Sequence, residues 1–329
     1  MSAYEPPALM PATACPGVAR HVLVRLLRPR GVPDGGRRRL RAEVWVPGQG
    51  TRTLHWSQPL RADTLAPGRL ARAAIVEADL AATAPIEALR VWPAALAADV
   101  DLLQTVPDAW LGPQAAHTRA AFALLWQRLS EPMRAWFNAL FWRHPQRLWA
   151  FVQARASLQH HHARAHGLLQ HSLDCAQRAL RLAAGDPSVD AEVLIMAALL
   201  HDLGKADEYR WDAAQRRWRL TLRGELIGHR LSTLQWMTEA LAELPLASRP
   251  QALREMAVHH AIHACWAPDW VGLRRPRTPE ALVLGSVDAL SGQIDLIEQC
   301  RARGAPAGRY VPALGTRVYW GLGASATAT

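Results

Sequence analysis

Histidine and aspartate residues that could bind a metal ion recur through the second half of the chain. In chain order they are His171, the adjacent pair His201–Asp202, His229, the adjacent pair His259–His260, and Asp288. Imidazole and carboxylate groups are ligands that Mn²⁺, Fe²⁺, Co²⁺ and Zn²⁺ accept in proteins. The four cysteines are scattered and form no CxxC pair, so we expect reduced thiols that fill space and a metal site built from histidines and carboxylates.

The pair His201–Asp202 follows a run of uncharged, mostly apolar residues, Val193–Leu200. Such a run predicts a buried helix, and Gly204 supplies a natural helix stop. An imidazole and a carboxylate at the end of a buried helix cost several kcal/mol of desolvation unless they are paired or bound to an ion. The position therefore favours a metal site over a chance His-Asp dipeptide.

Asp288 is the only charged residue in the stretch Ala281–Ile294. Thr278 and Pro279 form a good helix start, with threonine as the cap and proline in the first turn. A solvated acid on an uncharged helix is possible, but a buried acid that ligates a cation explains the pattern better.

The other histidines also lie on predicted helices. His171 lies at the edge of the packing face of a helix that continues to Leu182. His229 lies among leucines in the predicted helix Gly224–Met237, and the pair His259–His260 ends another helix. Taken singly, each of these histidines is more often a core residue or a solvated helix end than a ligand.

The order of these residues over separate helices is more informative than any one of them. Side chains from several helices can converge in the interior of a bundle. Six or seven candidate ligands exceed what one octahedral ion needs once waters are counted. The pattern therefore favours two metals bridged by Asp202, about 3.5–4 Å apart, which clamp a phosphoryl group and provide a metal-activated hydroxide.

The elements that must position these residues follow a segment of short strands, so the chain is predicted to be an α+β multidomain protein. Residues Arg39–Val46 alternate polar with apolar side chains, as in a half-buried strand. About five such strands over residues 19–92 fit a small barrel, with an OB-fold as the leading interpretation and a generic β-domain as the alternative. We expect a flexible tail at 1–18, linker and packing helices at 93–150, an all-α bundle at 151–303 and a C-terminal tail at 304–329.

The composition is basic, with a formal net charge of +10 and a pI of about 10.5. Such a charge suits a polyanion, with nucleic acid as the first candidate, although an arginine-rich and alanine-rich composition is an equally simple source of it. No apolar run is long enough to span a bilayer and no secretory signal is evident, so we expect no membrane partner and a cytoplasmic location.

The motifs resemble those of the HD superfamily of metal phosphohydrolases, and among these the YhaM-type 3′→5′ exoribonucleases. The matching segments are His161–Ala163, Gly167–Ser172, Ala198–Lys205, Gly224–His229, Thr278–Leu282 and Asp288. The resemblance covers about residues 150–300, and over 20–92 it depends only on the strand pattern. It implies an N-terminal OB-fold, a C-terminal HD domain and two divalent metals per chain, with Mn²⁺, Co²⁺ or Fe²⁺ preferred over Zn²⁺ or Mg²⁺.

The resemblance also assigns roles to residues of this chain. The implied metal ligands are His171, His201, Asp202, His229, His259 or His260, and Asp288. Asp202 and Lys205 are the implied catalytic residues, with Lys205 placed to meet a phosphate or to stabilise developing charge. A lysine at the surface end of a helix is the alternative for Lys205.

Residues around the centre are candidates for holding the substrate. The segment Arg210–Arg223 predicts a basic hairpin whose arginines and tryptophans could hold phosphates and stack bases, although the tryptophans could instead pack beneath it. The chain departs from the family at His166-Gly167 and over Ala261–Arg277, where substrate would be held. The expected substrate-binding residues are His166, Lys205, Arg217, Trp218 and Arg274.

Together these features predict a metal-dependent phosphodiesterase that acts on single-stranded RNA or DNA, as a 3′→5′ exoribonuclease would. Two alternatives remain open from the sequence. The same centre could hydrolyse nucleotides or other small phosphate esters. The chain could also be a non-catalytic nucleic-acid-binding protein, because the HD-like domain of conjugative relaxases shares the His-rich opening and the His-Asp pair.

Overall fold

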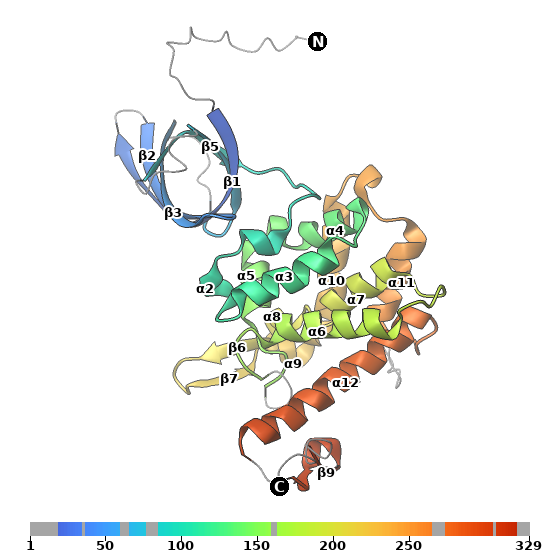
Figure 1. Ribbon diagram of the computed structural model, residues 1–329. Coiled ribbons are helices and arrows are strands. Elements are labelled where there is room, and N and C mark those ends of the chain that lie inside the picture. Colours follow the sequence, from blue (N-terminus) through green and yellow to red (C-terminus); the bar gives the residue numbers. More distant parts are fainter. Residues whose placement is uncertain are drawn as a thin grey trace, which may run out of the picture. The chain divides into compact units, whose positions relative to one another are not determined.

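A computed structural model describes residues 19–34, 37–59, 66–76, 85–158, 163–264, 274–304 and 307–320. The chain divides into two compact units, Met1–Ala94 and Ala95–Thr329. The first unit is made of strands, and the second is mainly helical (Figure 1). The expected α+β multidomain organisation, with a small barrel ahead of a helical domain, is therefore confirmed. Each unit is described separately below.

The first unit is a closed five-stranded barrel with the strand order β1-β2-β3-β5-β4. Neighbouring strands are antiparallel except β3 and β5, which pair in parallel. This closed arrangement of five strands is the OB-like barrel that the sequence predicts. The strands are β1 (Ala19–Asp34), β2 (Arg37–Val46), β3 (Gly50–Pro59), β4 (Leu70–Val76) and β5 (Ile86–Pro93).

Strand β2 shows how the side chains divide between the inside and the outside of the barrel. Leu40, Ala42 and Val44 point into the apolar core, whereas Arg39 and Arg41 are exposed on the outer surface. Because successive side chains of a strand point to opposite faces, this alternation buries one face and leaves the other in water. The outer face of β2 is therefore basic.

The second unit consists of helices with two small hairpins. Its helices are η1 (Leu102–Thr105), α2 (Asp108–Leu111), α3 (Ala115–Trp126), α4 (Glu131–Trp142), α5 (Pro145–Gln153), α6 (Gly167–Leu182), α7 (Ala191–Leu200), α8 (Lys205–Glu208), α9 (Leu222–Leu226), α10 (Gly228–Glu243), η2 (Leu246–Ser248), α11 (Ala252–His263), α12 (Pro279–Ala302) and η3 (Pro312–Leu314). The hairpins pair β6 (Tyr209–Asp212) with β7 (Arg217–Leu220) and β8 (Arg309–Val311) with β9 (Thr316–Val318).

Helix α7 forms the centre of the helical unit. Its residues Val193–Leu200 are all at most 1% exposed. The helix begins at the cap Asp190, whose carboxylate accepts hydrogen bonds from the amides of Glu192 and Val193. It packs against α6, α11 and α12. The buried helix expected from the apolar run is therefore present, and its C-terminal end lies where these three helices converge.

The structure differs from the sequence expectations at two places in this unit. The predicted helix Gly224–Met237 is broken, because Gly228 has a left-handed φ of +75° and separates α9 from α10. The segment 304–329, expected to be a tail, contains the β8–β9 hairpin. Among the described residues, no helix is both long and apolar enough to cross a membrane. The predicted N-terminal tail, the histidines at 160–162 and the stretch 265–273 lie outside the described residues.

Candidate metal centre

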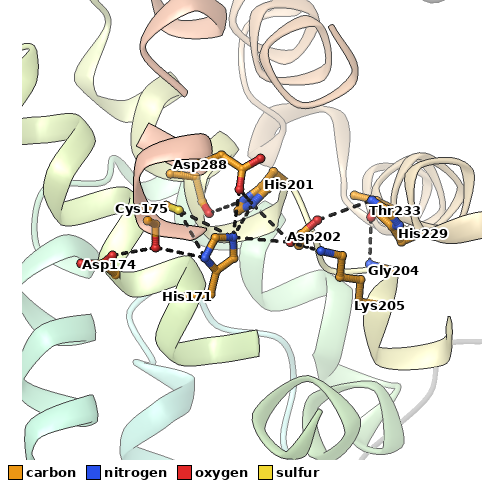
Figure 2. A network of polar contacts seen from close by, with 12 residues as sticks. His171, Asp174, Cys175, His201, Asp202, Gly204, Lys205, His229, Thr233 and Asp288 are labelled. Atoms are coloured by element: carbon orange, nitrogen blue, oxygen red, sulfur yellow. Dashed lines mark hydrogen bonds and ion pairs between the residues drawn. The ribbon is translucent and has the colours of Figure 1, made fainter. Parts of the chain in front are cut away.

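Four side chains from three places in the chain meet at the end of α7 (Figure 2). His171 comes from α6, His201 and Asp202 follow α7 directly, and Asp288 comes from α12. The Nε2 atoms of His171 and His201 lie 3.2 Å apart. Asp202 Oδ2 lies 3.5 Å from each of these nitrogens, and Asp288 Oδ1 lies 3.1 Å and 3.7 Å from them. Three segments that are far apart in the sequence are thus brought to one point.

Hydrogen bonds fix which ring nitrogen of each histidine faces the centre. The Ser291 hydroxyl donates to Asp174 Oδ2 at 2.7 Å and therefore accepts from the Nδ1–H of His171, at 3.2 Å. His201 donates its Nδ1–H to the carbonyl of Ala198 at 2.9 Å. The Nε2 atoms of both rings therefore face the centre, where each could bind a cation after losing its proton, and metal-binding histidines are held by neighbouring groups in this way.

The distances among these four acceptor atoms fit a bound cation. Two imidazole nitrogens at 3.2 Å with two carboxylate oxygens beside them repel one another unless a positive charge, from a proton or a metal ion, lies between them. Ligand atoms about 2.0–2.1 Å from a metal ion are themselves roughly 3.0–3.4 Å apart, depending on geometry. The residues present therefore fit a divalent metal ion.

The electrostatics of the centre lead to the same conclusion. Burial lowers the pKa of His201, but Asp202 and Asp288 together raise it to about 9. Burial raises the pKa of Asp202, yet Lys205 and the three surrounding histidines hold it well below its usual range. Partial burial opposes ionisation of Asp288, and hydrogen bonds from His171 and His201 lower its pKa. The centre thus holds two carboxylates charged and attracts a cation or a proton.

This balance predicts a pH dependence for the metal-free protein. A histidine whose pKa is raised on folding contributes stability that is fully present below its unfolded value of 6.5 and is lost as pH rises through about 9. In EDTA we expect the free energy of unfolding to fall by up to about 3 kcal/mol over this interval. The urea midpoint of the helical circular-dichroism signal, measured from pH 6 to 9, checks this.

Two comparisons sharpen the measurement. His201→Gln should flatten the pH dependence, whereas His144→Gln, which changes a half-buried histidine beside Glu243, should leave it as in the wild type. Saturating Mn²⁺ should restore stability most at the alkaline end, because the metal replaces the lost proton. A midpoint that does not change with pH in EDTA contradicts the prediction.

Ser291 gives a second prediction, because it orients His171 without facing the centre itself. Ser291→Ala removes the acceptor of the Nδ1–H and lets the imidazole turn or change tautomer. We expect metal affinity to fall about 10- to 100-fold with the fold intact. Metal titration by calorimetry measures this. Ser286→Ala is the matched control, since its hydroxyl bonds to Leu282 on the same helix, and equal affinities for the two variants contradict the prediction.

A second half of the centre lies on the other side of Asp202. Asp202 Oδ1 faces the Nε2 of His229 at 3.5 Å, and Glu208 accepts the Nδ1–H of His229 at 3.0 Å. Asp202 therefore has one oxygen toward His171 and His201 and the other toward His229. The Lys205 ammonium donates to Asp202 Oδ2 at 2.6 Å. A carboxylate in this position can bridge two cations.

Gly204 permits this second half to form. A Cβ at this position would lie 2.8 Å from both the Cα and the carbonyl carbon of His229. The Gly204 amide also donates to Thr233 Oγ1 at 2.8 Å, which holds α10 against the turn that follows α7. The helix ends before Gly204, as expected, but the backbone φ of Gly204 is −62°, which any residue adopts, so glycine is needed here for close approach.

The centre opens into a cavity of ≈ 250 Å³. Its polar lining includes His201, Asp202, Lys205, His229, Arg230 and Asp288. Asp288, expected to be buried, has a side chain that is 46% exposed. Its carboxylate thus lies at the border between the buried ligands and the open cavity. Lys205 and Arg230 thus bring two cationic groups to the cavity beside the His and Asp cluster.

Two histidines expected as ligands lie elsewhere. The His260 Nε2 accepts a hydrogen bond from the Arg277 amide at 3.0 Å. The His259 ring packs on Trp136 and His263, with centroids 5.5 Å and 6.0 Å away. Within the described part of the chain, no contact joins either residue to Asp202 or Asp288. Their role as ligands stays a prediction.

Of the expected substrate-binding residues, one lines the cavity and the others lie elsewhere in the helical unit. Lys205 lines the cavity. His166 is in a left-handed conformation just before α6, and its ring donates to the carbonyl of Val152 at 2.9 Å. Arg274 is exposed on the segment before α12. Arg217 and Trp218 lie on the β6–β7 hairpin, which begins directly after α8.

Three residues that support the centre were not anticipated. Cys175 lies one helical turn after His171, and its sulfur is 3.7 Å from both ring nitrogens of that histidine. Burial first, and then the nearby carboxylates, raise the pKa of this thiol, so it stays protonated beside the charged acids. The sulfur lies in a cluster with His171, His201 and Asp288, but a protonated thiol is a poor metal ligand, so the expectation of a reduced, space-filling thiol stands. The four-residue spacing between His171 and Cys175 could have indicated this contact, because residues four apart are neighbours on a helix. Ser291 and Glu208 had no signal in the sequence.

The helical unit that carries the His and Asp centre matches a known protein family. Residues 168–292 match the HD domain family, which confirms the resemblance seen in the sequence. The chain is similar to the 3′-5′ exoribonucleases YhaM of Bacillus licheniformis (27% identical over 158 residues) and Bacillus subtilis (26% over 158 residues). Each alignment covers 47% of this chain and 48% of the relative, so the chain spans about half the length of these curated relatives. No solved structure gives a significant match.

Proposed function

We propose that this protein is a metal-dependent phosphodiesterase that shortens single-stranded RNA from its 3′ end. The observation that carries the proposal is the convergence of His171, His201, Asp202 and Asp288 with interatomic distances of 3.1–3.7 Å at the edge of a cavity. A divalent cation held there would activate water and neutralise phosphate charge. The similarity to the YhaM exoribonucleases supports a nucleic-acid substrate.

The residues of the chain would divide the work as follows. His171, His201, Asp202 and Asp288 would hold one cation, and Asp202 with His229 would contribute to a second. Lys205 and Arg230 face the cavity and would bind the non-bridging oxygens of the phosphate. The Glu208 carboxylate would keep His229 in one tautomer. The exposed arginines on the barrel of the first unit would add attraction for the strand.

The test uses purified full-length protein, Mn²⁺ and an RNA oligonucleotide labelled at its 5′ end. Progressive shortening of the labelled product supports 3′→5′ hydrolysis, and a parallel 3′-labelled substrate should release its label as a mononucleotide. Small phosphate esters and mononucleotides are assayed beside it. If metal is bound and no oligonucleotide is cut, the proposal is wrong; if only the small esters are cut, the centre hydrolyses small molecules instead.

A further inference from the structure

The β6–β7 hairpin is attached to the candidate metal centre at both ends. Before it, α8 begins with Lys205 and ends with Glu208; after it, α9 leads to His229. The base of the hairpin is closed by hydrogen bonds from Thr221 to the carbonyls of Asp207 and Glu208, at 2.8 Å and 2.9 Å. Figure 1 shows the two strands as a ribbon at the edge of the helical unit. A ligand bound to this ribbon would therefore lie beside the centre.

The register of the hairpin separates its side chains into two chemical faces. Trp211 pairs with Trp218 and Tyr209 with Leu220, so these four share one face. Arg210 pairs with Arg219 and Asp212 with Arg217, and these share the opposite face. One face is thus aromatic and apolar, and the other is charged. We call them the aromatic face and the basic face.

The aromatic face presents an accessible ring. Trp211 is 50% exposed, and its ring meets that of Trp218 edge to face at 6.1 Å. Trp218 is less exposed, and the Arg155 guanidinium lies 5.3 Å from its ring centroid. Trp211, rather than the Trp218 expected from the sequence, therefore has ring surface left for a ligand. Toward the base of the hairpin the face continues to Tyr209, which lies near Lys205.

The basic face gives the hairpin a net positive charge. The three arginines of this face, at 210, 217 and 219, and Arg216 in the turn are all exposed and stand against one aspartate. Asp212 pairs with Arg219 at 3.2 Å and also interacts electrostatically with Arg210, whereas Arg216 and Arg217 form no ion pair among the described residues. Arg210 and Arg219 lie directly opposite each other, which is unfavourable for like charges. A bound polyanion would relieve this repulsion.

We propose that the hairpin is a platform for single-stranded nucleic acid, with Trp211 stacking on a base and the arginines attracting the backbone phosphates. This inference rests on the proposed function, since it supplies the substrate strand to the same centre. A base offers its flat face only when it is unpaired, and aromatic rings in basic surfaces bind such bases with little sequence preference. Duplexes should bind poorly to this platform.

The test is oligonucleotide binding in EDTA, where metal-dependent hydrolysis does not interfere. Trp211→Ala should weaken binding of a labelled single strand about 5- to 150-fold in fluorescence anisotropy. Trp149→Ala is the matched control, because Trp149 is 48% exposed on α5 of the same unit. Trp211→Phe should keep most of the affinity, and Trp211→Leu should lose it. This comparison still tests the platform if the alanine variant folds poorly.

Salt dependence distinguishes the two faces. Arg210→Gln with Arg217→Gln should reduce the slope of log K against log salt by about 1.4, since each lost phosphate contact removes about 0.7 for a single strand. Trp211→Ala should leave that slope unchanged. The platform is overturned if Trp211→Ala binds the single strand as tightly as the wild type does, or if Trp149→Ala loses as much affinity as Trp211→Ala. It is also overturned if the wild type binds a duplex as tightly as a single strand, or does not bind the single strand at all.

Failure of the platform can be told apart from failure of the proposed function. Hydrolysis of bis(p-nitrophenyl) phosphate requires the metal centre but offers no base to stack. Trp211→Ala should therefore hydrolyse this ester at the wild-type rate. Wild-type binding without any hydrolysis would overturn the proposed function alone, whereas oligonucleotide cleavage that ignores Trp211 would overturn the platform alone.

Discussion

Asp202→Asn should reduce phosphodiester hydrolysis by on the order of 10³-fold or more, because this carboxylate serves both halves of the centre. Its Oδ2 lies 3.5 Å from the Nε2 atoms of His171 and His201, and its Oδ1 lies 3.5 Å from that of His229. Asparagine keeps the shape but removes the negative charge that a cation needs. We also expect the metal content per chain, measured by elemental analysis, to fall.

The matched control is Asp207→Asn. Asp207 follows closely in the sequence, but its side chain is 51% exposed and, among the residues that the structure describes, forms a surface ion pair with Arg223. A surface pair of this kind contributes at most about 1 kcal/mol, so activity and metal content should stay near the wild type. If Asp202→Asn kept its metal and more than a tenth of the activity (roughly 1.4 kcal/mol of barrier), the centre would not work through this carboxylate.

Gly204→Ala should have the second large effect, because the added Cβ collides with the backbone at His229 rather than with a flexible side chain. The start of α10 must move, at a cost of about 3 kcal/mol in the free energy of unfolding. His229 would then leave Asp202, and activity should fall about 10- to 100-fold. Urea unfolding and steady-state hydrolysis measure the two effects.

Gly185→Ala separates lost stability from lost positioning. Gly185 has a φ of +82°, and no atom lies within 4 Å of the position that a Cβ would take there. Alanine at this position therefore costs about 1–2 kcal/mol of backbone strain without touching the centre. We expect this variant to lose stability and retain activity. If Gly204→Ala lost activity no more than Gly185→Ala, close packing at His229 would not matter for the reaction.

The barrel and the buried helix could be predicted because each follows from the pattern of polar and apolar residues within a short segment. Alternating side chains in Arg39–Val46 define an inner and an outer face, and an uninterrupted apolar run in Val193–Leu200 admits only a buried element. The convergence of His171, His201, Asp202 and Asp288 followed from their order on separate helices. The periodicity of apolar residues thus indicated the strands and helices, and the metal-binding character of histidine and aspartate indicated which of their side chains meet.

Features that depend on long-range packing could not be predicted. The bond from Ser291 to Asp174 joins residues 117 positions apart, and that from His229 to Glu208 crosses the whole hairpin. The exposure of Asp288 and the orientation of the His259–His260 pair depend on how α11 and α12 pack, which no local pattern records. Gly204 was noticed as a helix stop, but its actual role appears only when the backbone of α10 is beside it.

The closed base of the β6–β7 hairpin has a consequence for how this domain can be altered. Thr221 ties the two ends of the ribbon together next to Asp207 and Glu208, so the positions of Lys205 and His229 do not depend on the length of what lies between. The exposed tip at 213–216 should tolerate inserted residues. The hairpin can therefore be lengthened, shortened or replaced without moving Lys205 or His229. Such a change would alter which part of a ligand the domain contacts, while the arrangement of the metal centre stays the same.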